Sequence, residues 1–180
     1  MPKFWSKFEA HRVLAAVAVA VLGLSGCSQA PSSAAVVDGT VIGVSEIEAA
    51  SAAAAPIVGQ DAASLGPTVV QAHVQGLVAE KIAKNHSIEL TDAARAETIA
   101  GNSVLAKLAD TPGGKNLAVA LANTAVVAGK VDTTTFAAEC SQAVVVVNPR
   151  YGSWAKELCG LDSDSGSLSK PAPTPVTNAG

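Results

Sequence analysis

The sequence predicts a mainly α-helical domain with a small antiparallel β-sheet, an α+β fold. Two β-branched runs flank Asp38 and Gly39 early in the chain, and Asp-Gly favours a two-residue hairpin because both turn positions take a positive φ. Through the middle of the chain, apolar residues recur with helical spacing. Late in the chain, residues 144–147 form a run of valines, which is too short for a helix and typical of a strand buried on both faces.

The first predicted elements are the hairpin at residues 35–43 and a helix at about residues 46–55. Ser45 and Glu48 have the spacing of a capping box, in which each side chain satisfies the backbone amide of the other residue. The helix is expected to stop before Pro56, because proline lacks the amide hydrogen that a helix interior needs.

The following helices are placed by apolar spacing, cap residues and helix breakers. Residues 59–66 are predicted to form a loop, with Pro67 at the first position of the next helix, where its missing amide hydrogen is not needed. Thr91 is a suitable N-cap for the helix after that. The predicted helices span residues 67–85, 91–109, 115–127 and 133–142, with a break at residues 111–114.

The amino terminus has the pattern of a secretory signal peptide. Basic residues precede an apolar run at residues 13–24, which is shorter than the roughly 20 residues that a membrane-spanning helix needs. The Leu-Ser-Gly-Cys sequence that ends at Cys27 resembles the lipobox of bacterial lipoproteins, in which the cysteine is acylated and becomes the first mature residue. We therefore expect a signal peptide at residues 1–26 and a tether at residues 27–34. The alternative is an ordinary signal peptide cleaved near an incidental cysteine.

These features predict a lipid-anchored protein on the extracytoplasmic face of the cell membrane, with the bilayer as its partner through acylated Cys27. The formal net charge is −3, so no basic face is expected for nucleic acid or for anionic lipid. Membrane attachment must then depend on the acyl chains rather than on a polybasic patch.

Two further cysteines remain in the mature chain, Cys140 and Cys159. An even number of cysteines in a compartment that permits disulfides favours a bridge between them. The alternative is a pair of free thiols, one of them buried. No CxxC sequence and no neighbouring histidine supports redox or zinc chemistry at these positions.

The sequence predicts no catalytic residue, no metal site and no cofactor. His73 and His86 lie apart along the chain, and the acidic residues around Asp162 lack the spacing of a calcium loop.

Two interpretations are open for the roles of Arg150, Tyr151 and Trp154. They could form a peptide-binding lip, since arginine and aromatic residues dominate contact hot spots. Alternatively, the two aromatic residues fill a core that is otherwise made of alanine and valine, and the arginine pairs with a helix acid. The second interpretation is favoured, because only three aromatic residues remain in the mature chain.

Two stretches, one near each end of the mature domain, resemble the sequence of a known protein family. Residues 37–42 with 45–47, and residues 145–154 with their Asn-Pro-Arg-Tyr-Gly-Ser-Trp sequence, resemble the N-terminal chaperone domain of the SurA-like extracytoplasmic foldases, in the lipoprotein form found in actinobacteria. The resemblance covers residues 35–160. It implies that the hairpin pairs with the strand near residues 143–148, with helices packed against the sheet.

The resemblance also implies a chaperone or foldase role, in which the protein binds unfolded exported polypeptides. Full members of the family carry a parvulin-type prolyl isomerase domain, and the residues after Trp154 are too few to form one. We therefore expect binding without catalysis, and a disordered tail at residues 161–180. The alternative is a structural or adaptor lipoprotein that binds one folded partner in the envelope.

Overall fold

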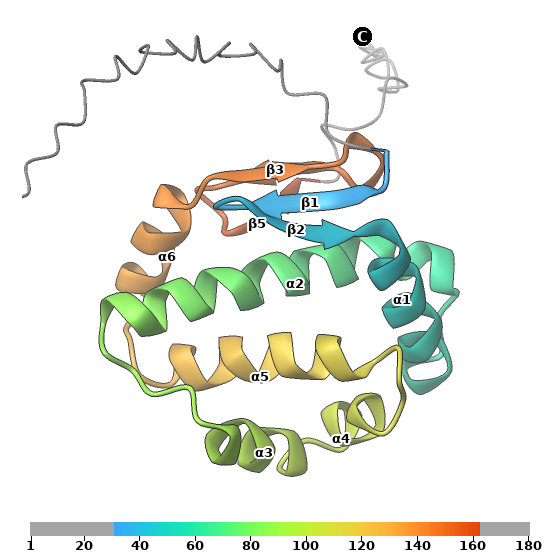
Figure 1. Ribbon diagram of the computed structural model, residues 1–180, viewed down its shortest axis with the longest axis horizontal. Helices are drawn as coiled ribbons and strands as arrows, with labels where there is room; N and C mark the ends of the chain where they lie inside the picture. Colours follow the sequence, from blue (N-terminus) through green and yellow to red (C-terminus); the bar gives the residue numbers. More distant parts are fainter. Residues whose placement is uncertain (1–30, 163–180) are drawn as a thin grey trace, which may run out of the picture.

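A three-stranded sheet lies along one side of a set of helices in the computed structural model, which describes residues 31–162 (Figure 1). The predicted signal peptide, Cys27, the first part of the tether and residues 163–180 lie outside the described residues. Within residues 31–162, no helix is both long and apolar enough to cross a membrane.

The sheet joins the two ends of the described chain. Its strands are β1 (Ser33–Val37), β2 (Thr40–Gly43) and β3 (Val145–Val147), in the order β2-β1-β3 and antiparallel throughout. Asp38 and Gly39 both have a positive φ, as the Asp-Gly turn requires. The predicted pairing of the hairpin with the strand near residues 143–148 is confirmed.

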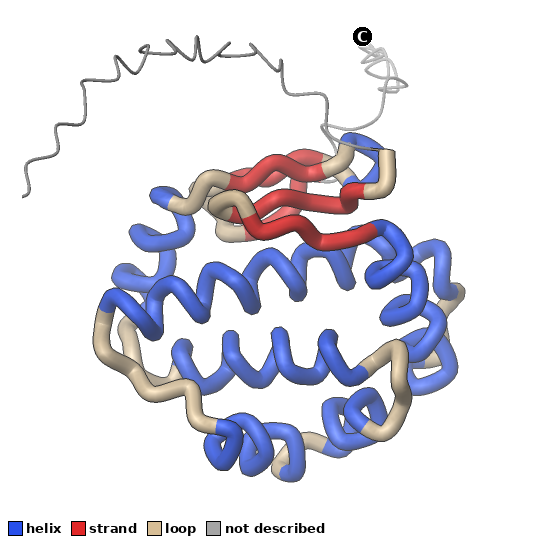
Figure 2. Tube along the Cα trace, in the orientation of Figure 1, coloured by secondary structure: helices blue, strands red, loops and turns tan. Residues whose placement is uncertain are grey.

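Helices make up most of the fold, and Figure 2 shows the strands gathered at one side of them. The long α2 lies between the sheet and α5 (Figure 1). A second, two-stranded sheet follows the turn η1 (Pro149–Tyr151) and pairs β4 (Ser153–Ala155) with β5 (Gly160–Asp162). The helices are α1 (Val44–Val58), α2 (Ala62–Asn85), α3 (Asp92–Ala100), α4 (Ser103–Ala109), α5 (Lys115–Ala128) and α6 (Thr133–Gln142).

Both prolines that were expected to mark helix ends lie inside helices. The first helix continues through Pro56, and the second begins at Ala62, with the Asp61 carboxylate accepting hydrogen bonds from the amides of Ala63 and Ser64. Each proline removes one helical hydrogen bond but lies within two turns of a helix end. Packing of both helices against the core maintains the helical conformation in spite of that loss.

The expected capping box is absent, because α1 begins two residues earlier than predicted. Gly43 is the N-cap, and no side chain caps the helix. The predicted helix at 91–109 is interrupted at residues 101–102, where the Asn102 side chain accepts hydrogen bonds from the amides of Val104 and Leu105 and starts α4.

Several predicted boundaries shift by one or two residues. Ser33 and Ala34 belong to β1 rather than to the tether, and residues 161–162 belong to β5 rather than to the tail. The expectation that residues 144–147 are buried on both faces is wrong. Val146 is 43% exposed, because helices cover only one face of the sheet.

Two helices of the core, α2 and α5, approach closely at Gly76. A Cβ atom at Gly76 would lie 2.7 Å from the Cβ atom and 2.8 Å from the Cα atom of Ala120. Real Cβ atoms essentially never approach that closely, so the helix separation depends on the missing side chain. At this crossing the small side chains thus permit close packing of the two helix backbones.

We expect Gly76→Ala to destabilise the protein by up to about 2 kcal/mol. Overpacking against backbone costs about 1–3 kcal/mol and outweighs a helix-propensity gain of about 1 kcal/mol. Urea unfolding measures the change. Gly129→Ala is the matched control, because a Cβ atom there would lie 3.5 Å from its nearest neighbour. Equal unfolding midpoints for Gly76→Ala and the wild type would contradict this packing interpretation.

Asp38 connects the hairpin turn to both α2 and the strand that follows α6. Its carboxylate accepts a hydrogen bond from Lys81 Nζ at 2.8 Å and one from the Val144 amide at 3.0 Å. The Asp38 amide in turn donates to the Val144 carbonyl. The hydrogen bond from Lys81, followed by that from the Val144 amide, lowers the pKa of Asp38 below its ordinary value.

Asp38→Asn is expected to cost up to about 1 kcal/mol of stability at neutral pH, since both partners of the ion pair are about a third exposed. Asparagine tolerates the positive φ and keeps an acceptor for the Val144 amide. Because the folded-state pKa is lowered, the charge stabilises the fold above the ordinary Asp pKa of about 4, and this stabilisation disappears as the pH falls through the folded-state pKa. Urea unfolding at about pH 7 and about pH 2.5 tests this. Asp110→Asn, at an exposed carboxylate, is the control. If Asp38→Asn and the wild type differed in free energy of unfolding by the same amount at both pH values, the stabilising role of the Asp38 charge would be contradicted.

Candidate functional site

The structure brings two of the three predicted binding residues to one pocket. Arg150 and Tyr151 belong to η1, where the ring of Tyr151 is buried and the guanidinium of Arg150 is exposed. Trp154 lies in β4, packs against the core and does not line the pocket. The tyrosine fills the core, as the second sequence interpretation expects, and it also forms a wall of the pocket.

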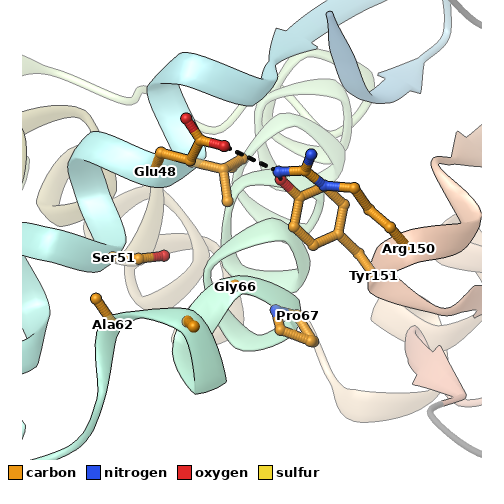
Figure 3. Close-up of a pocket in the computed structure, with 9 residues that line it drawn as sticks. Glu48, Ser51, Ala62, Gly66, Pro67, Arg150 and Tyr151 are labelled. Atoms are coloured by element: carbon orange, nitrogen blue, oxygen red, sulfur yellow. Dashed lines mark hydrogen bonds and ion pairs between the residues drawn. The ribbon is translucent and has the colours of Figure 1, made fainter. Parts of the chain in front are cut away.

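The pocket has a volume of about 430 Å³ and lies between α1, α2 and η1 (Figure 3). Its position follows from the β1–β3 pairing, because η1 comes directly after β3 and is thereby held against the first two helices. Most of its lining is apolar and comes from Ile47, Ala62, Ala63, Gly66, Pro67 and the ring of Tyr151.

Charged groups occupy one side of the pocket. Arg150 Nη2 lies 3.0 Å from Glu48 Oε1 and also donates a hydrogen bond to the Tyr151 hydroxyl, while the guanidinium carbon lies 4.6 Å from the centre of the Tyr151 ring (Figure 3). The hydrogen bond to Glu48 and then that to Tyr151 raise the pKa of Arg150 above its ordinary value. The pocket thus carries a permanently charged donor that is held by two partners.

A polar group without a partner lies deeper in the pocket. Ser51 is 3% exposed, and its hydroxyl oxygen makes no hydrogen bond within the described structure. Figure 3 shows this hydroxyl directed away from α1 into the space beside α2. A buried hydroxyl without a partner is destabilising, so a bound group that offers a hydrogen-bond acceptor or donor would remove that cost.

A second polar cluster surrounds His73 on α2. Its Nδ1 lies 3.8 Å from Glu46 Oε1, and its Nε2 is buried without a hydrogen-bond partner in the described structure. Burial lowers the pKa of His73, and the nearby Glu46 carboxylate only partly opposes this effect. Glu46 also accepts a hydrogen bond from Asn116. Within residues 31–162, no group of three or more histidine, cysteine, aspartate or glutamate side chains could hold a metal ion.

The two predicted disulfide partners lie together. The sulfur atoms of Cys140 and Cys159 are within bonding distance, and their Cα atoms are 5.5 Å apart. The pair connects the end of α6 to the β4–β5 hairpin. Two glutamines of α2 hold the same hairpin, since Gln75 donates to the Cys159 carbonyl and Gln71 accepts from the Leu161 amide.

Sequence reasoning expected a helix acid as the partner of Arg150 but did not identify it as Glu48, and it missed Ser51. Glu48 was assigned to a capping box, and Ser51 stands in a run of alanines without a distinguishing motif. Only the packing of η1 against α1 identifies them as neighbours of Arg150. Comparison of the chain with protein-family models, with curated proteins and with solved structures finds no match.

We expect mass analysis of the non-reduced mature protein to show a bridge between Cys140 and Cys159. Replacing both residues by serine should destabilise the protein by about 2–4 kcal/mol, because the bridge restricts the unfolded chain. Urea unfolding measures the loss, and the wild type in reductant is the control expected to match the double variant. Two free thiols in the untreated protein would exclude the bridge.

Proposed function

We propose that this chain is a lipid-anchored extracytoplasmic protein with a chaperone-like role, which binds unfolded exported polypeptides without catalysing a reaction on them. The observation that carries the proposal is the pairing of β1 with β3. It joins the two ends of the domain in the way that the resemblance to the SurA-like chaperone domain implies. The lipobox-like sequence at Cys27 supports the anchor.

The pocket supports binding of polypeptide side chains. Its volume of about 430 Å³ falls at the lower end of the range for small-molecule sites, which is enough for one or two apolar side chains. Arg150 and Tyr151 are of the residue types that contribute most to contact energy. An apolar lining with few directional groups would select for hydrophobicity rather than for one sequence, as binding of varied unfolded chains requires.

The test is suppression of aggregation. We expect the purified mature protein to suppress aggregation of an unfolded client at stoichiometric ratios, measured by light scattering. Ala62→Phe should weaken the suppression, because Ala62 lines the pocket beside Ser51 and a phenylalanine ring there would fill it (Figure 3). The matched control is Ala93→Phe, at an exposed position of α3.

Each outcome has a separate meaning. Loss of suppression in Ala62→Phe but not in Ala93→Phe supports the pocket as the binding site. Suppression that is equal in both variants would assign client binding to another surface. Absence of suppression by the wild type would contradict the chaperone role, and co-purification of one folded envelope protein would then favour the adaptor alternative.

A further inference from the structure

The outer face of the three-stranded sheet carries a row of valines. Val36 lies opposite both Val41 and Val146 in the register of the sheet, so the three side chains stand side by side. Val41 is 62% exposed and Val146 is 43% exposed, whereas Val37 and Ile42, which point to the other face, are buried against the helices. The sheet therefore presents a continuous apolar strip away from the helical core.

A fourth valine extends this strip. Val144 is 66% exposed and stands two residues before Val146, so its side chain points to the same face. Large hydrophobic side chains that are exposed elsewhere in residues 31–162 are scattered singly over α1, α4 and the β4–β5 turn. Grouped exposed apolar side chains mark an interaction surface more often than single ones do. We name Val36, Val41, Val144 and Val146 the valine strip.

The length of the chain before β1 indicates what covers the valine strip. Cys27 precedes Ser33, the first residue of β1, by six positions. Because an extended chain covers at most about 3.5 Å per residue, the tether reaches about 20 Å. That reach is shorter than the diameter of about 35 Å expected for a domain of this size. An acylated Cys27 would therefore hold the sheet, which contains the first element after the tether, close to the lipid.

We propose that the valine strip rests on the bilayer interface when the acylated Cys27 is inserted, so that the domain has one fixed orientation on the membrane. The proposal rests on the lipid anchor of the proposed function. Val36 is half-buried, and transfer of the exposed Val41, Val144 and Val146 side chains from water to the interface is favourable. The acyl chains provide the attachment, and the strip selects the face that meets the lipid.

Tryptophan quenching by bromine-labelled lipid tests the orientation. The acylated mature protein is reconstituted in phosphatidylcholine vesicles that contain brominated acyl chains, and Trp154→Phe removes the one tryptophan of the mature chain. Val41→Trp places a tryptophan on the strip. Ala93→Trp places one at an exposed position of α3, which lies on the opposite side of the fold (Figure 1). Val146→Trp is a second strip variant in case Val41→Trp does not fold, as judged by circular dichroism.

We expect quenching at Val41 or Val146 to be several-fold stronger than at Ala93. Equal quenching at the strip and at Ala93 would overturn the proposal, since the domain would then rotate freely about its tether. Protection of the strip by self-association of the chain, with no quenching at any position, would also overturn it. Failure of the anchor is distinguished beforehand, because an unacylated Cys27 is detected by mass analysis and the protein would not sediment with the vesicles.

Discussion

The pairing of β1 with β3 is the constraint on which the rest of the structure depends. It brings Val37 beside Val145 and thereby closes a loop that contains all six helices of the described chain. Closing so long a loop is unfavourable in entropy, and the hydrogen bonds that join Asp38 to Lys81 and to Val144 reinforce the closure. The pocket depends on the same pairing, because η1 follows β3 and brings Arg150 to Glu48 of α1.

Small side chains determine how the helices pack within that closed loop. An alanine-rich core buries little apolar area per residue, but it permits helix backbones to approach closely, as α2 and α5 do at Gly76 and Ala120. Close backbone contact at this crossing thus adds to the burial of valine, leucine and isoleucine side chains elsewhere in the core. A core of this kind has little capacity to absorb an added methyl group, because the atoms that would need to move belong to the main chain.

The sequence was most informative where the local signal and the tertiary contacts agree. The Asp-Gly turn, the helical periodicity and the valines of β3 led to the correct fold class. The strand pairing was implied by the resemblance of the two ends of the domain. Local signals failed at Pro56 and Pro67, where packing outweighs the loss of one hydrogen bond. The sequence identified Arg150 and Tyr151 as candidate members of the pocket, but it did not identify the residues of α1 that face them. Ser51 and Glu48 line the pocket together with Arg150 and Tyr151 of η1, far along the chain, and no local pattern encodes that arrangement.

The location of the sheet partners also has a consequence for biosynthesis. A ribosome releases the chain from its amino terminus, so β1 and β2 emerge first and β3 emerges only after every helix has been made. During that interval one edge of β1 has hydrogen-bonding groups but no native partner, and exposed strand edges are prone to pair with other chains. That edge of β1 is therefore open to mispairing for the whole interval, and arrival of the valines of β3 removes the risk.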